Sequence, residues 1–352
     1  MQKIVKQVVG IDVAQKELVV CLGRMQDDFS PHLYARKTFL NTEKGFVTLI
    51  QWVKKMTDEA VSLRFVMEAT GVYHESLSYF LDEQGFALSI VLPNKMSNYM
   101  RTLETKTITD KTAAEAIAQF GLERHLQNWH RPKNIYKKLR QLTRERDQIV
   151  QQRTVAKNQL HAEEAEAAPH KKSIVRIKQR IALLDKQDKE IQAEVALLIK
   201  EDEEMQALLL IICSLPGVGL LTAAIVLGET AGFELIRNKR QLASYAGFDV
   251  KEKESGTSVK GKPRISKKGN SYLRKAMHLP ALTAIRHDER HKAIFARLVA
   301  KHGIKMKAAV AVQRKLLELI YTLATQKKMY DKNYGAQTAE SPVPTVQNNQ
   351  AA

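Results

Sequence analysis

Residues 8–22 read VVGIDVAQKELVVCL, and this stretch decides the fold of the first part of the chain. Val8–Val13 and Glu17–Leu22 are two runs rich in β-branched residues, joined by a short polar turn. This pattern predicts two strands linked as a hairpin. Apolar runs at residues 35–40, 63–67 and 87–92 predict three further strands. Between these strands, apolar residues recur at helical spacing, which predicts helices. The first part of the chain is therefore expected to be a mixed α/β sheet with helices packed on it.

Composition narrows the class of protein. The 352 residues are 44% hydrophobic and 27% charged, which fits folded domains with a large core. A formal net charge of +18 favours a polyanionic partner such as nucleic acid. Cys21 and Cys213 are too few for a disulfide framework or a zinc cluster. No apolar run is long enough to span a bilayer and no secretory signal is evident, so we expect a soluble intracellular protein without a membrane role.

The rest of the chain divides into three regions. Residues 131–205 are rich in Lys, Arg, Gln and Glu, with apolar residues at alternating steps of three and four from Ile174 to Leu198, interrupted by Asp188. This predicts a helical coiled-coil segment, either an antiparallel hairpin or a dimerising coiled coil. Residues 206–335 predict a mostly helical unit, and residues 336–352 a disordered tail. The first domain is assigned to residues 1–130.

Three carboxylates of the first domain stand at the ends of predicted elements. Asp12 interrupts an apolar strand, Glu68 ends another, and Asp110 precedes a helix. A buried carboxylate is costly unless it is paired or binds a metal, so Asp12 is the hardest to explain structurally. Together the three would suit Mg²⁺, which takes oxygen ligands. Individually, Asp110 is equally well explained as a helix N-cap and Glu68 as the start of a loop.

Two stretches of the C-terminal unit predict phosphate contacts. The first, LPGVGLLTAAIVLGE, has the form of a helix-hairpin-helix turn, in which Gly217 and Gly219 would present backbone N–H groups; a plain interhelical turn is an equal alternative. The second is a Gly- and Ser-rich stretch without acidic residues, whose seven basic residues are Lys260, Lys262, Arg264, Lys267, Lys268, Arg274 and Lys275. Ser255 lies just before this stretch and could act as a nucleophile toward phosphate.

The order of GID, MEATGVY and TDK, followed by LPGVG, LASYAGF and ESGTSVKGKPRISKKGNSYLRKAM, resembles the bridge-RNA-guided DEDD transposases of bacterial insertion sequences. The resemblance spans about residues 5–125 and 206–330. It implies a RuvC/RNase H-like first domain, a Mg²⁺ site that includes Asp12, Glu68 and Asp110, and Ser255 as the covalent nucleophile, with Thr257 and Ser258 as weaker alternatives. It also implies donor and target DNA, an element-encoded guide RNA, dimers that form a tetramer, and a cytoplasmic, nucleoid-associated enzyme.

One position departs from the family pattern. The family spacing D-x-x-D-A would place a fourth carboxylate three residues after Asp110, where this chain has Ala113. Glu115 is the next carboxylate, but on a helix it points about 200° away from position 113. We therefore expect this chain to bind its nucleic-acid substrate without cutting it. Because the rest of the motif is intact, an inactivated form of a family protein is favoured over a naturally divergent member of the family.

The sequence thus predicts an RNA-guided, Mg²⁺-dependent DNA recombinase. Two alternatives stay open. A RuvC-like nuclease would hydrolyse DNA with water and need no serine. A non-catalytic nucleic-acid-binding scaffold would use the carboxylates only as caps and turns.

Overall fold

The computed structural model describes residues 3–69, 71–103, 109–234, 236–251, 254–255, 259–260 and 264–332. The chain divides into two compact units, Met1–Arg131 and Pro132–Ala352. The second unit holds both the segment predicted as a coiled coil and the C-terminal helices. Lys262, Thr257, Ser258 and the predicted tail at 336–352 lie outside the described residues.

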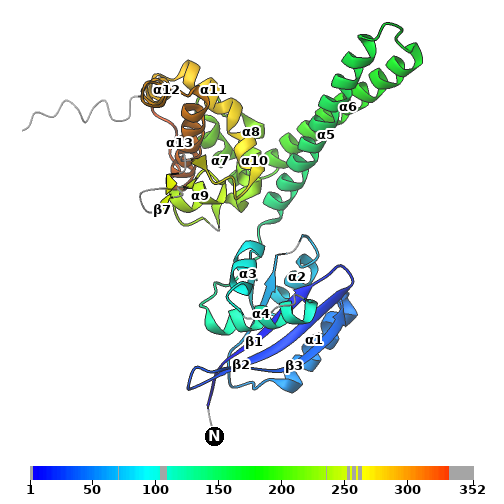
Figure 1. The fold of residues 1–352 in the computed structure, drawn as a ribbon, viewed down its shortest axis with the longest axis vertical. Helices are drawn as coiled ribbons and strands as arrows, with labels where there is room; N and C mark the ends of the chain where they lie inside the picture. Colours follow the sequence, from blue (N-terminus) through cyan, green and yellow to red (C-terminus); the bar gives the residue numbers. More distant parts are fainter. Residues whose placement is uncertain are drawn as a thin grey trace, which may run out of the picture. The chain divides into compact units, whose positions relative to one another are not determined.

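The first unit is built on a five-stranded sheet in the order β3-β2-β1-β4-β5 (Figure 1). The strands β1, β2 and β3 are antiparallel neighbours, whereas β4 and β5 run parallel to β1, which confirms the predicted mixed sheet. The strands are β1 (Ile4–Val13), β2 (Glu17–Gln26), β3 (Pro31–Leu40), β4 (Leu63–Glu68) and β5 (Ala87–Val91), and the helices are α1 (Glu43–Met56), α2 (Glu75–Glu83), α3 (Pro93–Met100) and α4 (Asp110–Glu123).

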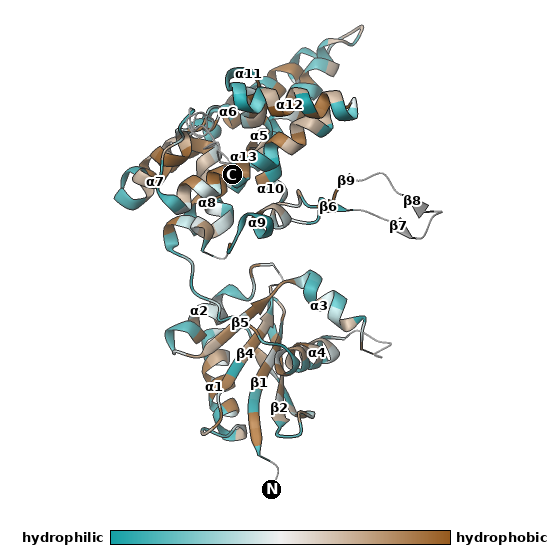
Figure 2. Cartoon of the chain, turned by 90° about the vertical axis from the view of Figure 1, so that its left-hand side faces the viewer, coloured by the Kyte–Doolittle hydropathy of each residue, from teal (hydrophilic) through white to brown (hydrophobic). Residues whose placement is uncertain are grey.

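Alternation along β1 sends side chains to two separate cores. Val9 and Ile11 pack with α1 and α2, in a cluster that includes Phe46. Val8 packs on the opposite face with α3 and α4, in a cluster that includes Ile117. Figure 2 shows the hydrophobic character of β4 and β5, the strands that both cores share. Helices therefore cover both faces of the sheet, and the strand ends are the accessible edge.

The second unit begins with a long helical hairpin. Helices α5 (Asn134–Glu164) and α6 (Lys171–Lys200) pack antiparallel within the chain, as contacts from Glu164 with Lys178 to Arg146 with Asp188 show (Figure 1). Asp188, which interrupts the apolar seam, is only 6% exposed. Its carboxylate lies 2.7 Å from Arg146 Nε and 3.0 Å from Arg153 Nη1, so two guanidinium groups of α5 compensate the buried charge.

Six of the remaining elements contribute to one apolar core around the base of this hairpin: α7 (Glu203–Cys213), α8 (Leu220–Thr230), the short 3₁₀ helix η1 (Ala231–Phe233), α9 (Lys239–Tyr245), α10 (Ser271–Ala276) and α13 (Lys305–Gln326). Two more helices, α11 (His278–His287) and α12 (Glu289–His302), pack against α13 and against each other. Two short ladders pair β6 (Val250–Lys251) with β9 (Arg264–Ile265), and β7 (Glu254–Ser255) with β8 (Val259–Lys260). Within the described ranges, no helix combines the length and the apolar character that crossing a membrane requires.

Candidate functional site

The ends of β1 and β4 bring Asp12 and Glu68 to the same level of the sheet. These strands are parallel neighbours, and Ile11 pairs with Met67. Asp12 and Glu68 are the next residues on their strands, so both carboxylates stand at the same edge. Both residues are half-buried. A rigid sheet therefore holds two acidic side chains next to each other at its carboxyl end.

Close packing of α4 on β1 adds the third carboxylate. A Cβ at Gly10 would lie 2.3 Å from the backbone nitrogen of Ala118 and 2.6 Å from the carbonyl oxygen of Ala114. Farther along the helix, a Cβ at Gly121 would lie 2.7 Å from Val8. The helix and the strand therefore run in opposite directions. The start of α4, one turn before Ala114, is directed toward the strand end that carries Asp12.

Electrostatics place Asp12 within reach of the charges of the other two carboxylates. The pKa of Asp12 is raised from 3.8 to about 6, first by burial and then by the negative charges of Asp110 and Glu68. Like charges raise the pKa of a carboxyl group because they disfavour its ionised form. The structure thus brings Asp12, Glu68 and Asp110 to one edge of the sheet.

At the start of α4, a residue other than Asp110 caps the helix. Thr109 is the N-cap, since its side chain accepts a hydrogen bond of 3.3 Å from the backbone N–H of Thr112. The Thr112 hydroxyl accepts in return from the backbone N–H of Thr109, at 2.8 Å. The alternative that Asp110 caps this helix is therefore wrong. Asp110 is the first residue of the helix and is exposed.

Position 113 has no side chain that could bind a metal. Ala113 is half-buried, one helical turn from Asp110. Glu115 is engaged elsewhere, because its Oε1 lies 2.8 Å from Nε of Arg36 on β3. This fits the expectation that Glu115 points away from position 113.

Asn41 was missed by sequence reasoning, and it links two segments that flank the carboxylates. Its Nδ2 donates to the carbonyl oxygen of Ala14, at 2.9 Å, and to that of Tyr73, at 3.1 Å. Ala14 follows β1 and Tyr73 lies in the segment after β4. Asn41 therefore ties together the chain segments that leave the two carboxylate-bearing strands. An asparagine between a strand and a helix gives no sequence signal for such a contact.

The donor chemistry of this edge fits a divalent cation. Three carboxylates provide hard oxygen ligands, and a cation among them would relieve the repulsion that raises the pKa of Asp12. In the part of the chain that the structure describes, no three His, Cys, Asp or Glu side chains already stand in a metal-holding arrangement. The carboxylates would therefore have to draw together on the ion.

Ser255 lies in the second unit, on a short strand. Its backbone pairs with Val259, and Glu254 pairs with Lys260, so the two strands form a narrow hairpin. A second ladder, in which Lys251 pairs with Arg264, joins the two segments that lead to this hairpin. The predicted nucleophile and the predicted basic residue Lys260 thus belong to one β-hairpin.

A buried glutamate fixes the segment that follows this hairpin. Glu229 on α8 is 4% exposed, and Arg144 on α5 donates to both of its carboxylate oxygens, at 2.7 and 2.8 Å. Asn270, the N-cap of α10, donates to the same carboxylate at 2.6 Å. Tyr245 adds a hydrogen bond of 3.0 Å from its hydroxyl to the Glu229 carbonyl. The return from the hairpin is therefore anchored on two long helices.

The predicted basic residues separate into two groups. Arg274 is turned inward, and its guanidinium donates to the carbonyl oxygen of Ala246 at 2.7 Å. Lys275 lies 2.9 Å from the carboxylate of Asp147. The three others that the structure describes with side chains are exposed: Arg264, Lys267 and Lys268.

The two glycines of the LPGVG turn also differ. Gly217 has a φ of +85°, and a Cβ there would lie 2.7 Å from the carbonyl oxygen of Pro280, so packing against α11 requires glycine. Gly219 is the N-cap of α8 and has open space where a Cβ would be. The turn lines a cleft of about 590 Å³ together with His287 and Lys332. Gly219, the N-cap of α8, therefore lines an accessible cleft that also contains Lys332.

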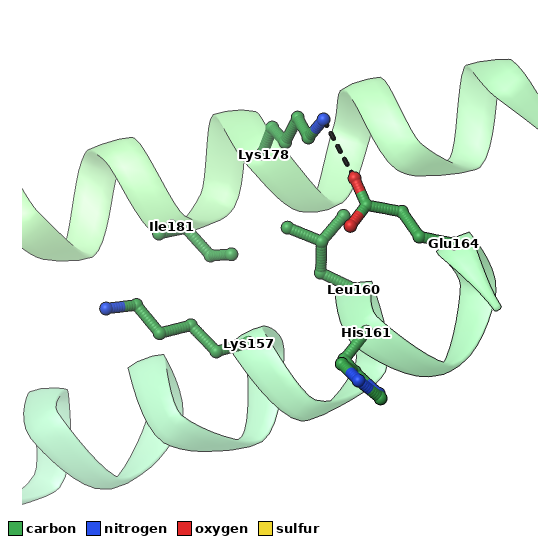
Figure 3. A pocket seen from close by; sticks show the side chains of 6 residues that line it. All are labelled: Lys157, Leu160, His161, Glu164, Lys178 and Ile181. Carbon is green, nitrogen blue, oxygen red and sulfur yellow. Dashed lines mark ion pairs between the residues drawn. The ribbon is translucent and has the colours of Figure 1, made fainter.

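A smaller hollow of about 370 Å³ lies between the helices near the tip of the hairpin (Figure 3). Leu160 and Ile181 line it, and Lys178 pairs with Glu164 across it at 2.9 Å. These residues explain helix packing and carry no catalytic arrangement.

Comparisons with known proteins identify two family matches, the first of which extends from the first unit into α5. Residues 9–163 match the IS110 DEDD family, described as a transposase, and residues 210–296 match the family described as transposase IS116/IS110/IS902. The pilin gene-inverting protein of Moraxella lacunata is 25% identical over 332 residues, which cover 93% of this chain and 98% of the relative. The transposase for insertion sequence element IS1111A of Coxiella burnetii is 30% identical over 123 residues, 33% of each chain.

Among solved structures, Thermus thermophilus RuvC in complex with a Holliday junction substrate covers 35% of this chain and 99% of its own length. The sequence identity is 10% and the TM-score is 0.27.

Proposed function

Since this chain carries the two domains of IS110-family transposases, we propose that it is an RNA-guided DNA recombinase of an insertion sequence. Its coarse function, that of a transposase or recombinase acting on DNA, follows from those domains, from the Moraxella lacunata relative, which is matched over 98% of its length, and from the partial match to the IS1111A transposase. The observation that supports the finer proposal is the meeting of Asp12, Glu68 and Asp110 at one sheet edge in a chain that also carries Ser255.

The carboxylate edge would hold Mg²⁺ through Asp12, Glu68 and Asp110. The ion would supply positive charge that stabilises phosphoryl transfer. Among the protein groups, Asp12 limits this binding, because below a pH of about 6 its carboxyl group is protonated. Burial and the neighbouring charges thus make cation binding depend on pH. Ala113 leaves the site one ligand short of the family pattern, and we propose that this chain binds DNA but cuts it poorly.

Ser255 would carry the covalent step. Its Oγ attacks a DNA phosphorus, a phosphoserine bond forms, and the bond from phosphorus to the leaving sugar oxygen breaks. The serine proton passes to solvent water as the attack proceeds, and the leaving sugar oxygen takes up a proton from solvent water. Exposed cations near the hairpin, such as Lys267 and Lys268, would stabilise the added negative charge. The acidic cluster and the serine would come from different subunits of a tetramer that hairpin-linked dimers assemble.

Substrate choice would rest with a guide RNA that pairs with donor and target DNA. The protein would then contact backbones more than bases, which fits a charge of +18 and only 6% aromatic residues. The open start of α8 at Gly219, and the exposed residues Arg264, Lys267 and Lys268, are the proposed contacts. Gly217 supports the turn sterically.

The test is strand exchange between donor and target DNA, with Mg²⁺ and the noncoding RNA that flanks the element. The chain is compared with its Ala113→Asp variant and with Ser255→Ala in that background. We expect exchange only with Ala113→Asp, and its loss with Ser255→Ala. Exchange by both the chain and Ala113→Asp would overturn the four-carboxylate account. Cutting that survives Ser255→Ala would favour a nuclease that uses water.

A scaffold without catalysis predicts a different result in calorimetry. If Mg²⁺ binds neither the chain nor Ala113→Asp, the carboxylates serve structure alone.

A further inference from the structure

A second concentration of positive charge lies on α12 and the start of α13, separate from the loop at 260–275. Residues 286–307 contain seven Lys and Arg residues and only two acidic residues, Asp288 and Glu289. Asp288 is 4% exposed and is used inside the fold, since its carboxylate accepts from the backbone N–H of His291 at 2.9 Å. Glu289 lies 3.3 Å from Lys292. The other cations of this stretch therefore have little local compensation.

The cations line up along one side of α12. Arg290, Arg297 and Lys301 are spaced by seven and four residues, which keeps them within about 40° around the helix axis and spans about 16 Å. All three are exposed. Helix α13 packs against α12 and adds Lys305 and Lys307 in its first turn, both also exposed (Figure 1). Arg290, Arg297, Lys301 and Lys307 thus form one surface, which we call the α12–α13 basic surface, since Lys307 and Lys301 both act on His302. Lys305 points about 200° away from Lys307 around the helix axis.

Two observations show that this charge is concentrated and uncompensated. The pKa of His302 is lowered, first by desolvation and then by the charges of Lys307 and Lys301, so both ammonium groups act on one point. Among the described residues, no ion pair is formed by Arg290, Arg297, Lys301, Lys305 or Lys307. Cations held close together without acidic partners repel one another, and a bound polyanion removes that repulsion.

The surface continues toward the LPGVG turn. His287, in the last turn of α11, lines the same cleft as Gly219 and Lys332. Helix α12 begins two residues later, at Glu289. A backbone that enters the cleft at the start of α8 can therefore continue along α12.

We propose that the α12–α13 basic surface is a second nucleic-acid contact, which grips consecutive phosphates of a DNA or RNA backbone. This proposal rests on the proposed function only in taking nucleic acid as the ligand. The spacing of the cations along α12 suits phosphates of one strand, and no base-reading geometry is required.

Salt dependence of binding by the full chain tests this assignment. The triple variant Arg297→Ala/Lys301→Ala/Lys307→Ala is compared with a matched control, Lys44→Ala/Lys54→Ala/Lys55→Ala, which removes three exposed cations from α1. Anisotropy of labelled duplex DNA and, separately, of single-stranded RNA gives the dissociation constant against salt concentration. Loss of three phosphate contacts should lower the slope of log affinity against log salt by about 2 to 3, and the control should not change it.

Each outcome decides the proposal. A lower slope with DNA alone, or with RNA alone, identifies the bound backbone. Parent-like slopes with both nucleic acids, or an equal fall in the control, overturn it. If the triple variant melts earlier than the parent, Arg297→Ala alone is used, with an expected fall in slope of about 1. Binding needs neither Mg²⁺ nor Ser255, so a lower slope together with no strand exchange by the Ala113→Asp variant would contradict the proposed function and leave this contact standing.

Discussion

The carboxylate edge of the first unit and the serine hairpin of the second are built in opposite ways. Asp12 and Glu68 stand on adjacent strands of a five-stranded sheet, and α4 is pressed against that sheet with backbone in contact with backbone. Ser255 stands on a two-residue strand, and a buried carboxylate, Glu229, anchors the chain where it returns from this hairpin. Packing fixes the three carboxylates, whereas a charged hydrogen-bond network fixes the segment next to Ser255. The two regions should therefore fail under different mutations.

The largest effect is expected from Arg144→Ala. This change removes two hydrogen bonds from the buried Glu229 carboxylate and leaves Asn270 as its side-chain donor. Removing one partner of a buried ion pair costs about 3 to 5 kcal/mol, so the free energy of unfolding of the second unit, measured in urea, should fall by that amount. Lys133→Ala is the control, because it breaks an exposed pair with Glu204 and should cost less than about 1 kcal/mol. Equal effects would mean that Glu229 is not the anchor.

Gly10→Ala tests the packing of the other region. A methyl group at this position meets the backbone of α4, which cannot move away as a flexible side chain could. Overpacking of this kind costs about 1 to 3 kcal/mol in the free energy of unfolding. Gly219→Ala is the matched control, since it adds the same methyl group in open space. A Gly10→Ala protein as stable as its parent would show that the helix is not held against the strand.

Asn41→Ala sharpens the comparison within the first unit. The change removes two hydrogen bonds between segments that flank the carboxylates, and each is worth about 1 kcal/mol. We expect weaker Mg²⁺ binding in calorimetry and a small fall in stability. Asn41→Asp, which lacks the amide donors, should behave like Asn41→Ala. Unchanged Mg²⁺ affinity in both variants would limit Asn41 to a structural role.

The smallest effect is a pH dependence confined to the carboxylate edge. Because the pKa of Asp12 is raised from 3.8 to about 6, the folded protein keeps a proton there that the unfolded chain has released. Stability should therefore fall as the pH rises between about 4 and about 6. Asp12→Asn should remove this dependence, as measured by thermal unfolding across that range. A dependence that persists in Asp12→Asn belongs to another group.

Local patterns in the sequence were enough to predict the strands and the three carboxylates. The β-branched runs around Asp12 identify a buried strand, and a carboxylate in such a strand is an anomaly that short-range reasoning can detect. Mixed pairing followed from the hairpin and the later alternation of helix and strand. The strands and the carboxylate within one of them depend mainly on residues that are close together in the sequence.

Features that depend on distant contacts were not predictable in the same way. Arg274 and Lys275 lie in the same basic run as Lys267 and Lys268, yet only the fold shows that Arg274 turns toward Ala246 and Lys275 toward Asp147. Glu229 looks like an ordinary polar residue late in an apolar helix until Arg144 is brought to it. Capping by Thr109 in place of Asp110 is a local feature, set by the reciprocal hydrogen bonds between Thr109 and Thr112, and the sequence offered both neighbouring residues as candidates.

The two guanidinium groups that hold Asp188 also set the register of the α5–α6 hairpin. A slide of α6 by one heptad would take that carboxylate away from one of its two guanidinium groups, because Arg146 and Arg153 are themselves seven residues apart, and its buried charge would be less well compensated. Apolar side chains alone would tolerate such a slide, because the seam repeats every seven residues. The α5–α6 hairpin is therefore rigid and has a fixed length of about 45 Å from base to tip. A group that binds at its tip is kept at a constant distance from its base.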